Sequence, residues 1–366
     1  MRIALDSTPL IEPYGGIPCY VTELALALAE LLPDDEIHLL SDQEELYLDE
    51  RLLAQANVHT EPAAGPRFGG KWWSLALPLE LRRRRIDVFH GTNFEVPYWS
   101  FAPSVVTLHD LSPWHDPPVR PRGSEHVRKR APGSLERSRL VLTPTEAIRT
   151  EACAKFGLDP AKVIAIPHGV KDSAPDAHQA SAAEIESRLD ELGVQPPFVL
   201  YLGAAGERKN LRTALAGWLL ARGEAPNLGL VLAGPGTEAF RGGDDGLTAL
   251  GPVPQRDARA LLAAASAFVY PSYYEGFGLP VVEAMRAGAP VVVSCDPALL
   301  ETVGDAALTA DAESPEQWRQ AILEIVSKPE LAAELRKRGL ARASHFHWRS
   351  TAEQTRAAYE RAIRRS

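Results

Sequence analysis

The chain alternates between short apolar runs and longer segments whose apolar residues recur at helical spacing. Runs rich in β-branched residues predict strands at 2–7, 36–41, 87–91, 104–110, 139–145, 163–169, 198–203, 228–234, 267–272 and 291–294. Segments such as YVTELALALAELL and LRTALAGWLLA between them follow the helical period instead. Strands this apolar, separated by helices, are typical of buried parallel strands in βαβ units, so the pattern predicts an α/β fold.

The length of the chain indicates two domains, because 366 residues exceed one ordinary core. A polar stretch, KDSAPDAHQASAAE (171–184), is typical of a linker between them. The chain is therefore expected to hold two Rossmann-like domains in tandem. Ligands of such folds bind beyond the carboxyl ends of the strands, so the cleft between the domains is the expected site.

Composition narrows the class of protein. A hydrophobic content of 45% and a charged content of 24% are typical of soluble globular proteins, and a net charge of −9 disfavours nucleic acid as a partner. The N-terminus lacks the apolar region of a signal peptide, and no run approaches the length of a bilayer span. Cys19, Cys153 and Cys295 are isolated and without metal-ligand spacing. The expected location is the cytoplasm.

Two glutamates flank a glycine loop in YEGFGLPVVE. Glu275 is predicted on a strand-to-helix loop, and Glu283 in the first turn of the helix that Pro280 begins. A helix start favours an anion such as phosphate, and Gly276 and Gly278 let the backbone approach it. The two carboxylates would then accept hydrogen bonds from the hydroxyls of a sugar and a ribose. The alternative is a solvated loop residue and a glutamate that only complements the helix dipole.

A second loop, GAAGERKN, follows the predicted strand 198–203. It contains Gly203 and the adjacent cations Arg208 and Lys209, which could neutralise a diphosphate. The spacing is not that of a Walker loop. The alternative is a solvated basic pair beside a helix.

The N-terminal half offers weaker candidates. Gly15 and Gly16 lie between a strand and a helix, where backbone N–H groups could approach a ligand, although an ordinary turn is the simpler interpretation. His109 ends a strand and could bind a sugar hydroxyl or shuttle a proton; the alternative is a structural histidine. His90 and His168 end strands in the same way and rank lower.

Taken in order, these motifs resemble the retaining glycosyltransferases of family 4, the group 1 glycosyltransferases. The resemblance runs through YGGI, HD after VVTL, VLTPTEAIRTE, VIAIPHGV, YLGAAGERKNL, LVLAGPG, the E-x7-E signature EGFGLPVVE and a closing FHWRSTAEQTRAAYERAI. It implies the GT-B architecture, with two Rossmann-like domains facing across a cleft. The N-terminal, acceptor-side domain would span 1–172, the nucleotide-sugar-binding domain 185–346, and a last helix, 347–366, would cross back.

The resemblance also implies roles for residues of this chain. Glu275 would bind the donor sugar and stabilise an oxocarbenium-like transition state, and Glu283 would bind the ribose. Arg208 and Lys209 would bind the diphosphate, and His109 would lie near the sugar. Further donor contacts would come from Gly15, Gly16, Gly203, Phe277, Gly278, Leu279 and Pro280. The chain departs from close relatives in GIPCY, where Pro18 and Cys19 precede Tyr20. This departure affects the expected geometry of the acceptor side more than that of donor binding.

The implied reaction moves a sugar from a nucleotide diphosphate sugar to an acceptor hydroxyl with retention, in polysaccharide or glycoconjugate assembly, with mannose preferred. No metal or other cofactor is expected, because no suitable Asp-x-Asp loop is found and Arg208, Lys209 and the helix start can supply positive charge. No nucleophile stands out, which favours a same-face mechanism. The alternatives are a sugar-nucleotide epimerase or phosphorylase of the same fold, or a non-catalytic nucleotide-sugar-binding protein.

A basic and aromatic segment, RFGGKWWSLALPLELRRRRID (67–87), carries Trp72, Trp73 and Arg82 to Arg85. It could form an interfacial helix that reaches a lipid-linked acceptor, supported by basic residues in 120–130. The alternative is an amphipathic helix whose aromatic residues pack inside the domain.

Overall fold

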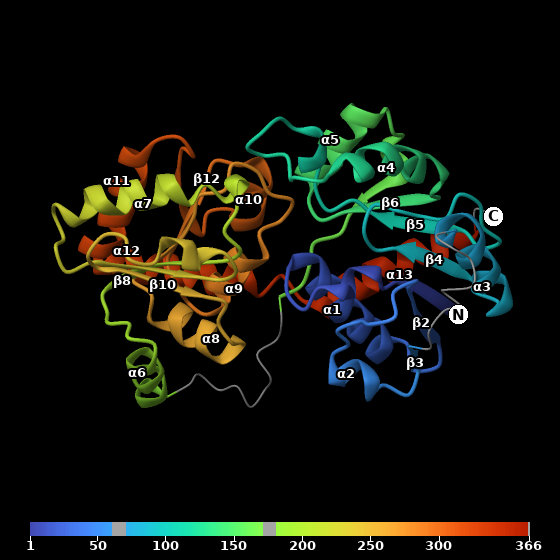
Figure 1. Cartoon of the computed structure of the whole chain (residues 1–366), viewed down its shortest axis with the longest axis horizontal. Coiled ribbons are helices and arrows are strands. Elements are labelled where there is room, and N and C mark those ends of the chain that lie inside the picture. Colours follow the sequence, from blue (N-terminus) through green and yellow to red (C-terminus); the bar gives the residue numbers. More distant parts are fainter. Residues whose placement is uncertain (61–70, 171–180, 365–366) are drawn as a thin grey trace. The chain divides into compact units, whose positions relative to one another are not determined.

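A computed structural model describes residues 1–60, 71–170 and 181–364 (Figure 1). The chain divides into two compact units. Unit 1 comprises 1–114, 122–169 and 347–366, and unit 2 comprises 115–121 and 170–346. Residues 115–121, inside the range expected for the first domain, cluster with unit 2. Each unit contains its own parallel sheet, as the strand pattern predicts.

Unit 1 is built on a seven-stranded parallel sheet of order β3-β2-β1-β4-β5-β6-β7. Its strands are β1 (Arg2–Asp6), β2 (Glu36–Leu40), β3 (Val58–His59), β4 (Val88–Gly91), β5 (Ser104–Thr107), β6 (Leu140–Thr143) and β7 (Val163–Ala165). Its helices are α1 (Gly16–Leu31), α2 (Glu50–Leu53), α3 (Leu77–Arg83), α4 (Glu125–Arg137), α5 (Glu146–Phe156) and α13 (Trp348–Arg364).

Unit 2 is built on a six-stranded parallel sheet of order β10-β9-β8-β11-β12-β13. Its strands are β8 (Phe198–Leu202), β9 (Gly229–Ala233), β10 (Leu247–Gly251), β11 (Ala267–Tyr270), β12 (Val291–Ser294) and β13 (Ala307–Ala310). Its helices are α6 (Ala182–Glu191), α7 (Leu211–Arg222), α8 (Gln255–Ala264), α9 (Leu279–Arg286), α10 (Pro297–Val303), α11 (Pro315–Ser327) and α12 (Pro329–Ala343).

All ten predicted strands are present, and the described residues contain three more that the pattern missed, β3, β10 and β13, each at a sheet edge. Most of their residues are only partly buried, whereas the residues of the interior strands are nearly all buried. The predicted linker, 171–184, falls mostly outside the described residues. Its last residues, however, form the start of α6, which Ser181 and Glu184 cap reciprocally, so the prediction of a linker is wrong for 182–184.

The C-terminal helix α13, red in Figure 1, packs beside α1 in unit 1 although it follows the whole of unit 2 in sequence. Trp348, Ala352 and Tyr359 of α13 belong to the buried apolar cluster that also contains β1 and α1. The packing is tight, since a Cβ on Gly169 would lie 2.2 Å from the backbone nitrogen of Trp348. The prediction that the last helix returns to the N-terminal domain is confirmed.

The segment predicted as an interfacial helix forms a π-helical turn, Trp72–Ala76, followed by the short helix α3; residues 67–70 lie outside the described range. Trp72 is only 3% exposed, so it packs in the interior of unit 1, as the alternative interpretation expects. The side chain of Arg84 is 6% exposed and pairs with Glu80. None of the helices within the described ranges has the length and hydropathy needed to cross a bilayer.

Candidate active site

The glycine loop of unit 2 joins β11 to α9. Gly278 precedes the helix with a positive φ of 89°, and a Cβ there would lie 2.5 Å from Cδ2 of Leu299, so only glycine fits without strain. Pro280 lies in the first turn, as predicted. Glu283 does not: Leu279 to Val282 fill that turn, and the glutamate follows in the second. The helix dipole therefore explains Glu283 less well than the sequence pattern suggested.

An ion-pair cluster of the buried Glu275 and two partly buried cations forms where this loop meets the loop after β8. The Lys209 ammonium lies 2.5 Å from Oε1 of Glu275, and Arg208 Nη1 lies 3.3 Å from Oε2. Arg208 also donates to the backbone oxygen of Tyr274 at 2.7 Å. Two cations from one predicted loop and a glutamate from another are thus brought together.

The backbone holds these two loops in register. The amide of Tyr273 donates to the carbonyl of Arg208 at 2.9 Å, and the buried Asn210 side chain donates to Pro271 at 3.2 Å and to Ala312 at 2.6 Å. Asn210 adopts a left-handed conformation, which asparagine tolerates better than most residues. Sequence reasoning missed Asn210, and its position directly after the two cations is the signal that could have found it.

The charge state of Glu275 follows from its partners. Burial raises the pKa of the carboxyl group, but Lys209 and Arg208 lower it more, to about 2. Glu275 is therefore an ionised carboxylate at neutral pH, and it can accept hydrogen bonds but cannot donate one. This excludes a role as general acid and leaves hydroxyl binding or charge stabilisation.

The remaining predicted donor residues of unit 2 lie on the same loops. Gly203 directly follows β8 and has a positive φ, and its amide donates to the carbonyl of Ala233 at 2.9 Å. The carbonyl of Phe277 accepts a hydrogen bond from Thr302 at 2.8 Å, which fixes the glycine loop against α10. Leu279 and Pro280 form the first turn of α9. The backbone around a ligand at this loop is therefore held before any ligand arrives.

The predicted residues of the N-terminal half all lie in unit 1. Gly15 and Gly16 are exposed at the start of α1. His109 is buried, and its Nε2 lies 2.7 Å from the carbonyl of Thr92. Because a carbonyl only accepts, Nε2 carries the proton and Nδ1 is the acceptor. Burial lowers the pKa of His109, so the imidazole is neutral.

His90 and His168 have structural surroundings, as their lower rank suggested. His90 Nδ1 lies 2.7 Å from the hydroxyl of Tyr359 and Nε2 lies 2.7 Å from that of Thr107, which ties α13 to the sheet. His168 is buried between the rings of Tyr20 and Trp348. Neither geometry indicates contact with a ligand.

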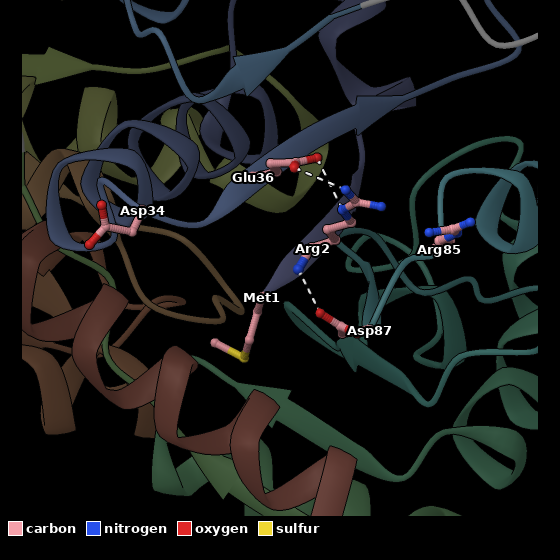
Figure 2. Close-up of a pocket in the computed structure, with 6 residues that line it drawn as sticks. All are labelled: Met1, Arg2, Asp34, Glu36, Arg85 and Asp87. Carbon is pink, nitrogen blue, oxygen red and sulfur yellow. Dashed lines mark hydrogen bonds and ion pairs between the residues drawn. The ribbon is translucent and has the colours of Figure 1, made fainter.

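A polar hollow of about 370 Å³ lies at the amino ends of β1, β2 and β4 (Figure 2). It is lined by Met1, Arg2, Asp34, Glu36, Arg85 and Asp87. Arg2 uses its amide to bind Asp87 at 2.7 Å and its guanidinium to bind Glu36 at 3.3 Å, as the dashed lines in Figure 2 show. The hollow lies at the amino ends of the strands, whereas the predicted residues of unit 1 lie at the carboxyl ends. Ligands of such folds bind at the carboxyl ends, so the hollow is not the expected kind of ligand site.

Within the described residues, the side chains of Glu36, His38 and His59 approach closely enough to hold a metal ion. His38 Nε2 lies 3.2 Å from Glu36, and its Nδ1 lies 3.5 Å from the guanidinium of Arg84. Arg84 can only donate, so Nδ1 accepts and Nε2 carries a proton toward Glu36. This hydrogen-bonded chain needs no ion, and the nearby guanidinium disfavours a cation.

Comparison with known proteins connects both halves of the chain to one family. Residues 14–174 match the family described as Glycosyltransferase Family 4, and residues 185–342 match Glycosyl transferases group 1. The O-antigen chain mannosyltransferase B of Escherichia coli is 31% identical over 388 residues, covering 98% of this chain and all of that protein.

Solved structures show the same architecture. Sucrose-phosphate synthase from Thermosynechococcus elongatus has a TM-score of 0.72 at 21% identity, with both chains fully covered. HepE from Anabaena, solved with UDP and glucose, has a TM-score of 0.75 at 19% identity, covering 98% of this chain and 99% of that one. The fold is therefore the predicted GT-B fold. With a full-length relative above 30% identity and family matches in both units, the chain belongs to the group 1 glycosyltransferases of family 4 and is a glycosyltransferase.

Proposed function

We propose that the protein is a retaining, metal-independent glycosyltransferase that moves mannose from a nucleotide diphosphate donor to an acceptor hydroxyl in polysaccharide assembly. The observation that carries this proposal is the buried Glu275 carboxylate, ion-paired with Lys209 and Arg208 beside the start of α9. The E. coli relative, named as an O-antigen chain mannosyltransferase, supports mannose and polysaccharide assembly.

The cluster suits a donor with a diphosphate and a sugar. The two cations and the N-terminus of α9 attract phosphate oxygens, and the cations can turn from the carboxylate to the diphosphate. Glu275 then accepts hydrogen bonds from hydroxyls of the sugar. It also stabilises the positive charge that develops at the anomeric carbon of the sugar. That HepE was solved with UDP and glucose supports a nucleotide sugar as the donor.

Retention follows most simply from a same-face reaction. The bond from the anomeric carbon to the phosphate oxygen breaks, the acceptor oxygen bonds to that carbon on the same face, and the leaving phosphate takes the acceptor proton. A double displacement would need a protein nucleophile. In this proposal Glu275 binds hydroxyls of the sugar and does not attack the anomeric carbon.

Lys209 and Arg208 can also perform the task of a metal ion, which is to neutralise the leaving diphosphate. We expect transfer to continue in excess EDTA. Loss of transfer in EDTA that added Mg²⁺ or Mn²⁺ restores would contradict metal independence.

The test of the cluster is substitution. Glu275→Gln and Arg208→Ala should each lower kcat/KM for transfer by about 10²–10³-fold, because each removes charge that stabilises the transition state. Arg319→Ala, which removes a surface ion pair with Glu316 in the same unit, should behave as wild type. Full activity of both cluster variants would refute the assignment. A thermal-shift screen with GDP- and UDP-sugars should show the larger stabilisation with GDP-mannose.

A lipid-linked acceptor would require contact with a membrane, and an aromatic surface of unit 1 supports this. Tyr98, Trp99 and Phe101 are 46%, 43% and 54% exposed. Arg82 lies 4.8 Å from the ring of Phe101, and Arg130 lies 5.5 Å from that of Tyr98. Exposed aromatic rings beside arginines are typical of surfaces that bind anionic lipids.

The membrane contact can be tested with vesicles that contain phosphatidylglycerol. The wild type should sediment with them, and a Trp99→Ala, Phe101→Ala variant should bind at least about tenfold more weakly, because each ring would contribute buried apolar area. Tyr47→Ala removes an exposed ring elsewhere in unit 1 and is the matched control. Equal sedimentation of the double variant and the wild type would exclude this surface.

A further inference from the structure

Tyr270 is a buried polar residue that no part of the proposed reaction yet uses. It is the last residue of β11 and is 1% exposed. Its ring stacks on that of Tyr201 from the neighbouring strand β8 at 6.0 Å and on that of Phe268 at 6.1 Å. The ring is therefore held rigidly, and its hydroxyl has a fixed position at the carboxyl end of the sheet.

That hydroxyl contacts the ammonium group of Lys209. Lys209 Nζ donates to the Tyr270 oxygen at 2.7 Å and lies 4.9 Å from the ring centroid. An ammonium has three donors. One binds Tyr270 and one binds Glu275, so the third remains for a ligand oxygen as far as the contacts among the described residues show.

The phenol suits this task because it is neutral. Burial raises the pKa of Tyr270 well above its usual range, so it keeps its proton. Since its oxygen accepts from Lys209, its own proton is directed to a different acceptor. A neutral acceptor does not compete with phosphate for the charge of Lys209, whereas a second carboxylate would.

We propose that Tyr270 is a positioning residue, which fixes the Lys209 ammonium so that its remaining donor faces the β-phosphate of the nucleotide. This inference rests on the proposed function. A lysine has a long flexible stem, and its ammonium needs fixed acceptors to hold one direction. Glu275 loosens from Lys209 when the diphosphate and sugar arrive, but Tyr270 remains as the anchor through the reaction.

The test compares nucleoside diphosphate with monophosphate. Titration calorimetry with GDP and GMP, and in parallel with UDP and UMP, isolates the contribution of the β-phosphate as the ratio of the two dissociation constants. Tyr270→Phe keeps the ring and removes the hydroxyl. It should lower this ratio roughly fivefold, the value of one hydrogen bond, and leave monophosphate affinity unchanged.

A double-mutant cycle separates positioning from a general structural effect. If Tyr270 acts through Lys209, Tyr270→Phe should have no further effect on the ratio in a Lys209→Ala background. Tyr359→Phe is the matched control, because it removes an equally buried phenol hydroxyl that binds His90 in unit 1. The control should lose thermal stability without changing the ratio.

Two results would overturn the positioning role: a wild-type ratio in Tyr270→Phe, or an effect of equal size with and without Lys209. Failure of the proposed function gives a different result. In that case the wild type itself would bind neither GDP nor UDP more tightly than the corresponding monophosphate, and it would transfer no mannose. The positioning role of Tyr270 would then fail together with the proposed function.

Discussion

Asp6 and Glu275 are both buried carboxyl groups, yet their pKa values move in opposite directions. Burial raises the pKa of Asp6 to about 7, because hydrogen bonds from Thr8 only partly offset it. Glu275 is equally buried, but two cations bring its pKa to about 2. The difference lies in partners that are distant in sequence, since Lys209 is 66 residues from Glu275. A buried carboxylate without a cation thus lowers the stability of the fold at neutral pH, whereas the two cations keep Glu275 ionised and able to accept hydrogen bonds.

Substitution of Asp6 should show this loss of stability as a change in unfolding free energy with pH. The pKa of Asp6 rises from 3.8 to about 7 on folding, so the stability it supports is fully present below pH 4 and is lost as the pH rises through 7. Asp6→Asn keeps an acceptor for Thr8 and does not titrate. It should therefore stabilise unit 1 relative to wild type by an amount that grows, between pH 4 and pH 8, to a few kcal/mol.

Urea unfolding of unit 1 at pH 4, 6 and 8 provides the measurement. A difference in unfolding free energy between variant and wild type that is the same at all three pH values would contradict the burial argument. Glu275 lies in unit 2, and Glu275→Gln should show the opposite trend there at lower pH, since a depressed pKa contributes stability that is present above about pH 4.5 and lost toward pH 2; unfolding of unit 2 at pH 2, 3 and 5 would reveal it.

At the scale of elements, the β11–α9 turn depends on a glycine for two separable reasons. Gly278 has a positive φ, and a side chain there would also strike Leu299. Gly278→Ala should therefore destabilise unit 2 by on the order of 2–4 kcal/mol, the sum of backbone strain and the displaced contact. It should also weaken GDP binding, because the start of α9 must shift.

Gly288 provides the matched control at the other end of the same helix. Its φ of 77° is also positive, but an added Cβ would meet nothing within 4 Å. Gly288→Ala should cost only the strain, about 1–2 kcal/mol, and leave GDP affinity unchanged. Thermal unfolding and titration calorimetry on both variants would check this, and equal effects would show that the contact with Leu299 is unimportant.

At the scale of the whole molecule, the C-terminal helix makes the fold of unit 1 depend on the end of the chain. Trp348 and Tyr359 of α13 are buried with residues of β1 and α1. A chain that ends at Phe346 should lose at least about 3 kcal/mol of stability in unit 1, the cost of removing one large buried aromatic residue. Unit 2 keeps its own core and should still bind GDP.

Limited proteolysis with and without GDP would test this division. Cleavage should accelerate within 1–169 and remain slow within 185–342. If the truncated chain resists protease in both halves, α13 is not needed for unit 1; if both halves are degraded, unit 2 does not fold independently.

The sequence by itself determined the interior strands and the edge strand β7, the helices between them and the loops at the carboxyl ends of strands. These features follow from apolar periodicity and from glycine and proline positions, which are local properties of the chain. It also predicted Glu275, Arg208 and Lys209 as ligand-binding residues, because charged residues on such loops are the usual ligand-binding groups of α/β folds.

Only the tertiary structure decided which of these residues meet and which are buried. It paired Glu275 with both cations, added Tyr270 and Asn210 as their supports, placed Trp72 inside and formed β3, β10 and β13 at sheet edges. Such contacts join residues far apart in sequence, and edge strands are stabilised by pairing with a neighbour rather than by their own pattern. Periodicity carries no information about either, because both depend on how separate segments pack together.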